Sequence, residues 1–91
     1  ANCAGNVEWL IVGRNTGSGA AYSSRLTCGY KCNAGVPTVV GQSETRNARE
    51  DGAPTDALAI VSGGTVALQI TGKAATTINW QAVRCGKIEV T

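Results

Sequence analysis

The sequence contains no histidine, no phenylalanine and no methionine, and its 91 residues include only two tryptophans and two tyrosines. Histidine is the commonest general base in enzymes and the commonest metal ligand in proteins. Its absence excludes a catalytic triad of the ordinary kind, and six carboxylates are then the main groups suited to acid–base chemistry. We therefore expect that the protein is not an enzyme and that it uses no cofactor and no metal.

Long apolar runs and dense positive charge are also missing. The longest apolar run is only a few residues long, which excludes a membrane-spanning helix. The formal net charge is +2, without the dense basic stripe and interleaved aromatics that are typical of nucleic-acid binders. We therefore expect no nucleic acid among the partners and no membrane span.

The chain is short, so cross-links matter more than in a larger protein. Its 91 residues form one domain, 1–91, and bury only about 60 to 65% of the surface that the unfolded chain exposes. Four cysteines, an even number, are spread almost from end to end, which is typical of small proteins from an oxidising compartment. We expect a secreted, extracellular protein whose signal peptide has already been removed, because the small first residue suits a cleavage site.

The spacing of the cysteines favours disulfides over zinc binding or redox catalysis. Cys28 and Cys32 are separated by three residues, whereas zinc knuckles and thioredoxin-like pairs commonly use two. In a straight strand these two cysteines would lie about 13 Å apart, beyond the reach of a bridge. We expect one of them to join Cys3 and the other to join Cys85, while a turn over residues 29–31 would instead allow a short-range bridge.

Alternating apolar residues predict three strands in the first half of the chain, over residues 7–12, 21–28 and 37–42. The first strand would share one face among Val7, Trp9 and Ile11. The second follows a glycine-rich turn, and one of its sides would carry Tyr22, Ser24, Leu26 and Cys28. The third begins with a proline, which cannot donate to a ladder of hydrogen bonds, so we expect it at the edge of a sheet.

The segment 43–56 is charged and contains Gly52 and Pro54, which predicts a surface loop. The stretch that follows has two interpretations. Thr55 would cap one short helix near 55–62. Alternatively, two adjacent glycines would form the two-residue turn of a β-hairpin. The β-branched residues favour the hairpin, which pairs Val61 with Val66, Ala59 with Leu68 and Ala57 with Ile70.

The C-terminal part predicts two more strands, over residues 77–84 and 87–90, with Gly86 as the break between them. The first would turn Ile78, Trp80 and Ala82 to one side, and the second would turn Ile88 and Val90 inward. Outward positions are predicted for Glu8 and Glu89, where cross-strand ion pairs are expected. The sequence thus predicts an all-β fold of six to seven short strands, a small disulfide-stapled β-sandwich or closed β-barrel.

Binding is the function class that this elimination leaves. Trp9 and Trp80 lie within apolar alternation, so we expect both in the core. The segment between Cys28 and Cys32 is expected to be rigid and exposed, and an exposed aromatic next to a cation has the properties of an interface anchor. A tyrosine packed on a disulfide is the equal alternative. The candidate binding residues are Tyr30, Lys31, Tyr22 and Arg25.

We therefore expect a secreted, disulfide-stabilised β protein that binds a macromolecular target, protein or glycan. Toxins, effectors and protein inhibitors act in this way. The alternative is a glycan-binding module or a subunit of a ring-shaped, lectin-like oligomer, in which Tyr22, Tyr30 or a tryptophan stacks on a sugar. Polar side chains in loops would then bind sugar hydroxyls, although asparagine in turns mainly serves backbone geometry. These side chains are Asn15, Asn33, Gln42 and Asn47.

Overall fold

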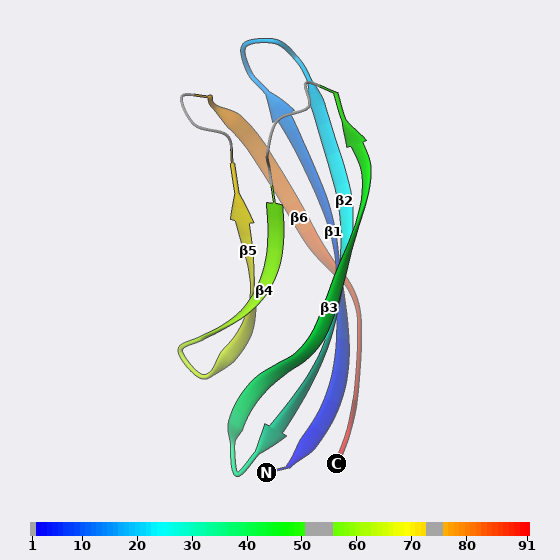
Figure 1. The fold of residues 1–91 in the computed structure, drawn as a ribbon, viewed down its shortest axis with the longest axis vertical. Coiled ribbons are helices and arrows are strands. Elements are labelled where there is room, and N and C mark those ends of the chain that lie inside the picture. Colours follow the sequence, from blue (N-terminus) through cyan, green and yellow to red (C-terminus); the bar gives the residue numbers. More distant parts are fainter. Residues whose placement is uncertain (1, 51–55, 73–75) are drawn as a thin grey trace.

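Six antiparallel strands make up the computed structural model, which describes residues 2–50, 56–72 and 76–91 (Figure 1). None of these residues is helical, so no helix in the described part could cross a membrane. The strands are β1 (Cys3–Asn15), β2 (Ala21–Asn33), β3 (Val36–Arg49), β4 (Asp56–Ser62), β5 (Thr65–Thr71) and β6 (Ile78–Val90). The all-β prediction is confirmed at this level.

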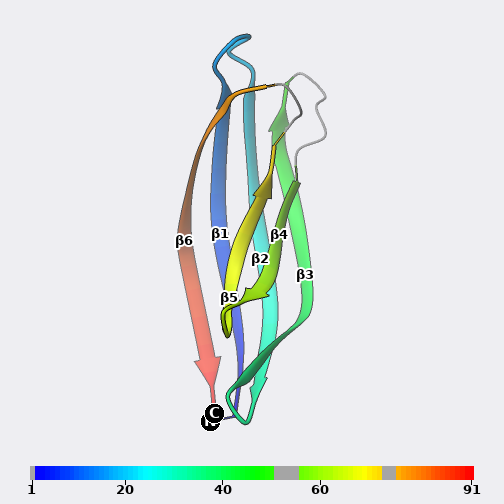
Figure 2. The same ribbon diagram turned by 90° about the vertical axis from the view of Figure 1, so that its left-hand side faces the viewer.

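Four of the strands form a long sheet in the order β3-β2-β1-β6, and β4 and β5 form a separate hairpin. The hairpin packs against one face of the sheet, here called the inner face, over β2 and β3 (Figure 1). Figure 2 shows β6 at the left edge of the sheet, outside the area that the hairpin covers. The molecule is elongated, 47 × 21 × 17 Å, and both chain ends lie at the same end of it.

The core lies between the inner face and the hairpin, and the predicted strand faces are confirmed there. On β1, Val7, Trp9 and Ile11 are buried, and β2 buries Leu26 and Cys28 almost completely. The hairpin contributes Ala57 and Ala59 from the opposite side. Because β1 and β2 are central strands, their alternation follows the pleat directly. The core is nevertheless thin, and several large apolar side chains remain exposed, among them Leu10, Val12, Val83, Ile88 and Val90.

The hairpin interpretation of residues 56–71 is confirmed, and the helix near 55–62 is wrong. The register pairs Val61 with Val66, Ala59 with Leu68 and Ala57 with Ile70. Gly63 and Gly64 both have positive φ angles, 57° and 78°, which a two-residue turn of this kind requires. Thr55, the predicted helix cap, lies outside the described residues. The two-glycine turn therefore determined the structure of this segment, and the predicted helix cap did not.

The predicted loop over 43–56 is wrong for its first half. Residues 43–49 continue β3, which pairs with β2 as far as the partnership of Tyr22 with Arg49. Gly52 and Pro54 lie outside the described residues. A charged segment becomes a strand here because it is an edge strand that an established neighbour pairs with, and pairing overrides weak β-propensity. The expectation that Pro37 belongs to an edge strand is confirmed, since β3 is the end of the sheet.

The two C-terminal strands predicted separately are one strand, β6, with a β-bulge inside it. Trp9 faces Arg84 and Glu8 faces Gly86, so Cys85 is the extra residue. A bulge shifts the alternation by one position, and every side chain beyond it moves to the other face. The inward positions predicted for Ile88 and Val90 are therefore wrong, because these side chains are 69% and 62% exposed.

The finer details of the predicted architecture differ from the structure. Four of the six strands are 13 or 14 residues long, so they are not short. The described strands form no closed barrel, because β3 and β6 are the two ends of the sheet. β2 also continues past residue 28 to Asn33, so the cysteine-containing segment is part of a strand and not a turn.

Candidate functional site: a cavity between the hairpin tip and the open edge strand

A cavity of about 220 Å³ lies on the inner face, between the tip of the hairpin and the end of the sheet where both termini lie. It is called the β6-side cavity here. Its floor consists of Val7, Trp9 and Tyr30. The hairpin tip contributes Gly64, Thr65 and Val66, and the end of the sheet contributes Cys3, Cys32 and Pro37. The third side belongs to β6, with Arg84, Lys87 and Glu89.

The floor is held in place by an aromatic ring packed on a glycine. Gly5 and Tyr30 are direct cross-strand partners, and a Cβ atom at Gly5 would collide with the ring and the hydroxyl of the tyrosine. The absence of a side chain at Gly5 thus lets the ring of Tyr30 lie close against the backbone of β1. The ring is only 8% exposed, so it presents little surface to a partner.

Tyr30, Glu89 and Cys3 form a hydrogen-bonded group at the end of the cavity. The Tyr30 hydroxyl donates to Glu89 Oε1 at 2.8 Å, and Cys3 Sγ donates to the same oxygen at 3.4 Å. Burial and the hydrogen bond to Glu89 raise the pKa of Tyr30 to about 12. The same hydrogen bonds lower the pKa of Glu89, while burial and the nearby carboxylate raise the pKa of the Cys3 thiol. The group is therefore a neutral phenol and thiol around one carboxylate at neutral pH.

Among the cations of this cavity, Arg84 has the positive charge that is least compensated by a nearby carboxylate. It faces Trp9 directly across the β1–β6 ladder, and its side chain is exposed. The two ion pairs found among the described residues join Glu8 with Arg25 and Glu44 with Arg46, so Arg84 takes part in neither. Lys87 differs, because it lies near Glu89, whose pKa it helps to lower. The cavity therefore combines an aromatic and aliphatic floor with a free guanidinium at its side.

The four cysteines are free thiols in the structure, so neither predicted disulfide is present. Cys3 and Cys32 are direct cross-strand partners on β1 and β2, consistent with one of the two expected pairings. The other pairing is wrong. Cys28 lies on β2 and Cys85 on β6, with β1 between them, so their Cα atoms are separated by at least about 9.6 Å, more than a disulfide spans. Burial raises the pKa of the Cys28 thiol.

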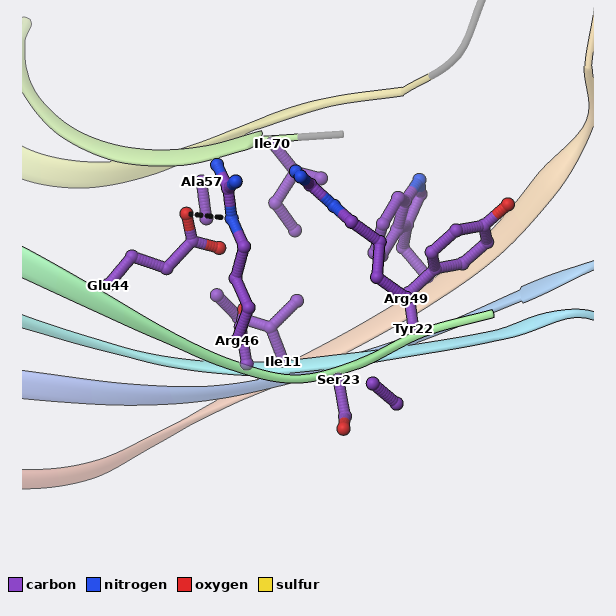
Figure 3. Close-up of a pocket in the computed structure, with 11 residues that line it drawn as sticks. Ile11, Tyr22, Ser23, Glu44, Arg46, Arg49, Ala57 and Ile70 are labelled. Carbon is purple, nitrogen blue, oxygen red and sulfur yellow. Dashed lines mark hydrogen bonds and ion pairs between the residues drawn. The ribbon is translucent and has the colours of Figure 1, made fainter. Parts of the chain in front are cut away.

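The opposite edge of the inner face carries similar charges but is closed by the hairpin. Arg46 and Arg49 extend from β3 toward Ala57 and Ile70 of the hairpin, and Arg46 Nε lies 3.1 Å from Glu44 Oε1 (Figure 3). The space left between these side chains is only about 20 Å³. A cavity of this size has room for about one water molecule, so this crevice is filled by the protein itself.

Gln42 of β3 attaches the hairpin at the same edge. Its side-chain Nε2 donates to the carbonyl oxygen of Ala59 at 3.2 Å, and its Oε1 accepts from the backbone N–H of Ala59 at 2.7 Å. Ala59 pairs with β5 on its other side, so the glutamine amide takes the place of a third strand. The hairpin is therefore fixed to β3 by polar contacts as well as by its apolar face.

The structure places the four predicted binding residues on opposite faces of β2. Tyr30 and Tyr22 are buried on the inner face, and Tyr22 packs on Trp80 with ring centroids 5.8 Å apart. Lys31 is exposed on the outer face, and so is Arg25, whose Nε lies 3.6 Å from Glu8 Oε1. The cross-strand ion pair expected for Glu8 is confirmed. Of the four residues, Tyr30 is the one that contributes to the β6-side cavity.

Sequence reasoning missed Arg84, Lys87 and the inward position of Glu89. Arg84 continues the alternation of Trp80 and Ala82, whereas the inward positions of Lys87 and Glu89 depend on the bulge at Cys85. The signal that could have found them is Gly86, since a glycine inside an alternating strand often marks a bulge. Read in that way, residues 87 and 89 face inward and residues 88 and 90 face outward.

Two further findings bear on function. Among residues 2–50, 56–72 and 76–91, no group of three or more cysteine, aspartate or glutamate side chains is placed to hold a metal ion. Comparisons with protein-family models, with curated proteins and with solved structures found no match to this chain. The geometry and the charges of the β6-side cavity are therefore the observations that bear most directly on function.

Proposed function

We propose that the protein acts by binding another protein at the β6-side cavity and not by catalysis. The observation that supports this most is the free guanidinium of Arg84 beside a floor formed by Trp9 and Tyr30. Arginine and aromatic residues are the side chains most enriched at the energetic centres of protein interfaces. A cation that forms no ion pair with the described residues, beside the apolar floor of the cavity, is suited to an acidic partner.

The size of the cavity favours an inserted side chain over a free small molecule. About 220 Å³ corresponds to roughly seven water molecules, whereas pockets for drug-sized ligands have about 300 to 1,000 Å³. An aspartate or glutamate from a partner would place its carboxylate on Arg84, in the paired hydrogen-bond geometry that guanidinium groups favour. Its aliphatic part would pack on Trp9 and Val66.

The proposal includes a secreted location and one disulfide, between Cys3 and Cys32. The two residues face each other across neighbouring strands, and both belong to the cavity. In an oxidising compartment, a small disulfide such as oxidised glutathione would accept two electrons and two protons from the two thiols. One S–S bond would then form in the protein while the small disulfide is reduced to two thiols. The bridge would join the start of the chain to the end of β2.

The glycan-binding alternative has less support. A sugar-stacking aromatic must expose a ring face, whereas Tyr22 and Tyr30 are 3% and 8% exposed. The Oδ1 atom of Asn15 accepts hydrogen bonds from Gly17 and Ser18, so it stabilises its own turn. Gln42 belongs to β3 and binds Ala59. No observation favours a sugar over an acidic protein segment.

The test uses two fluorescent peptides as probes, one alternating leucine with glutamate and one with glutamine in place of each glutamate. We expect the glutamate peptide to bind in fluorescence anisotropy, and Arg84→Gln to weaken this binding by about tenfold or more. Lys31→Gln is the matched control, because it removes the same charge from the outer face. Equal affinity for both peptides, or an equal loss in both variants, would contradict the proposal and indicate unspecific electrostatic attraction.

A further inference from the structure

The last part of β6, Gly86–Val90, is an open strand edge with exposed side chains on both of its faces. β6 ends the sheet, so one side of its backbone pairs with β1 and no described strand pairs with the other side. Figure 2 shows this edge clear of the hairpin. Beyond the bulge at Cys85, pairing with β1 is regular up to Val90, so the segment has no bulge that would turn its edge away from a neighbour.

Charges along this segment alternate in sign on the inner face. Lys87 and Glu89 are cross-strand partners of Val7 and Gly5, which places both on the inner face and Ile88 on the outer face. In an antiparallel pair centred on Ile88, Lys87 of each copy would stand opposite Glu89 of the other. Such directly opposed charges of unlike sign stabilise a strand pair, whereas like charges destabilise it. The segment is therefore complementary to itself.

The atoms of Glu89 leave room for this contact. Both hydrogen bonds that the carboxylate accepts within the chain, from Tyr30 and Cys3, end on Oε1. The Oε2 atom accepts none from the described residues. Lys87 likewise forms no ion pair within them. On the outer face, Ile88 is 69% exposed, and it would meet the same residue of the other copy at the symmetry axis.

We propose that a second copy of this chain pairs antiparallel with Gly86–Val90, centred on Ile88, and joins two four-stranded sheets into one eight-stranded sheet. The arrangement has two-fold symmetry, in which one surface meets itself, as in most small homodimers. Two ion pairs lie on the inner face and the two isoleucines on the outer face. Arg84 precedes the bulge and lies outside the paired segment, so this inference does not depend on the proposed function.

The edge strand β3 shows why a second copy is the fitting occupant of β6. β3 has Pro37 as its second residue and carries two β-bulges, and the hairpin held by Gln42 packs against its inner face. Prolines, bulges and covering elements are devices that prevent strand edges from pairing. After Cys85, β6 has no proline and no further bulge, and its unlike charges attract a copy of the same segment.

The test is the oligomeric state in sedimentation velocity over a range of protein concentrations. We expect a concentration-dependent dimer for the wild type. Lys87→Glu places Glu opposite Glu in a homodimer, and Glu89→Lys places Lys opposite Lys, so each variant alone should dimerise at least about tenfold more weakly. Mixed in equal amounts, the two variants should form a heterodimer, because every opposed pair is then of unlike charge.

Two controls separate pairing from folding. Tyr30→Phe removes the hydrogen bond to Glu89 and keeps its charge, so this variant should dimerise like the wild type. Ile88→Lys changes an exposed side chain and places two like charges at the axis, so it should be monomeric while its circular dichroism is unchanged. A wild type that is monomeric throughout, variants that dimerise like the wild type, or a mixture that does not associate would each overturn the proposal.

Discussion

The two edge strands of the sheet, β3 and β6, both carry charged side chains on the inner face, but they differ in how closely the hairpin approaches those side chains. On β3, Arg46 and Arg49 extend toward the hairpin, and the space left between these side chains is only about 20 Å³. On β6, the hairpin stops short of Arg84, and the adjoining cavity is about 220 Å³. On β3, the inward charges add to the proline and the bulges that keep this strand edge from pairing. The comparison indicates that the same residue types are structural where an element covers them and available for binding where none does.

The way each edge is attached differs as well. β3 is tied to the hairpin by the amide of Gln42, a polar contact with both backbone groups of Ala59. β6 is attached to the sheet through its ladder with β1 and through Trp80, whose ring lies over Gly13. Removing one contact from each edge therefore tests whether the covered edge carries more of the stability than the open one.

The largest effect is expected from Gln42→Ala at the covered edge. The change leaves the N–H and the C=O of Ala59 without partners, and Ala59 is only 3% exposed. Each buried backbone group without a partner costs about 1 to 3 kcal/mol, so the free energy of unfolding should fall by about 2 to 4 kcal/mol. Urea denaturation measures this. Gln81→Ala on β6 is the matched control and should change it by less than about 0.5 kcal/mol, so equal losses would refute the difference between the edges.

A smaller loss is expected from Gly13→Ala at the open edge. A Cβ atom there would collide with the six-membered ring of Trp80, which must then move away from β1. Overpacking of this kind costs about 1 to 3 kcal/mol. Gly41→Ala on β3 is the control, because a Cβ atom at Gly41 has no neighbour within 4 Å. Thermal unfolding that is unchanged in Gly13→Ala would show that Trp80 does not anchor β6.

The cavity floor should give the open edge a distinct response to alkaline pH. Tyr30 has a pKa of about 12 in the folded protein and about 10 in the unfolded chain, so the folded state holds this proton more tightly. Its stabilising effect is fully present below about pH 10 and is lost as the pH rises through about 12. Ultraviolet absorbance of ionised tyrosine, followed with unfolding curves, measures both.

Two variants sharpen this pH test. Tyr30→Phe should remove the loss of stability in that window, and Glu89→Gln should lower the pKa of Tyr30, because the carboxylate that favours the neutral phenol is gone. The pKa of Glu89 is lowered in the folded state, so its own contribution should be lost only when the pH falls through that lowered value. A Tyr30 that ionises near pH 10 in the folded protein would contradict the hydrogen-bonded group.

The smallest effect is a gain in stability at the turn that leads into β3. Ala34 has a φ angle of 50° next to Gly35 at 80°, which is a left-handed pair that alanine adopts with strain. Asparagine before glycine is the favoured sequence for such a turn. Ala34→Asn should therefore raise the free energy of unfolding by about 0.5 to 1 kcal/mol in urea denaturation. A loss of stability would contradict this turn geometry, and peptide binding at the β6-side cavity should be unaffected.

Local signals predicted the parts of the fold that depend on neighbouring residues. The paired glycines and the alternation around them specified the register of the β4–β5 hairpin. The inner faces of β1 and β2 followed from their apolar alternation, since both strands are central and buried on one side. Less could be predicted at the edges, because the charged residues 43–49 become a strand only through pairing with β2.

The candidate site was the least predictable part. Tyr30 was identified, either as an exposed anchor or as a ring packed on a disulfide, whereas its ring packs on Gly5 across the ladder. Arg84 was not identified, because Trp9 and Val66, which line the same cavity, come from strands that are distant in the sequence. Lys87 and Glu89 were assigned to the wrong face, since a single extra residue at Cys85 reverses the alternation.

The sequence by itself determined the all-β class, the position of the hairpin turn and which side of β1 and β2 is buried, because these depend on period-two alternation and on glycine at positive φ. Tertiary structure decided which edge of the sheet the hairpin packs against, that Arg84 joins no ion pair among the described residues, and which cysteines face each other. Those outcomes depend on contacts between segments that are far apart in the chain, and short-range patterns carry no information about them.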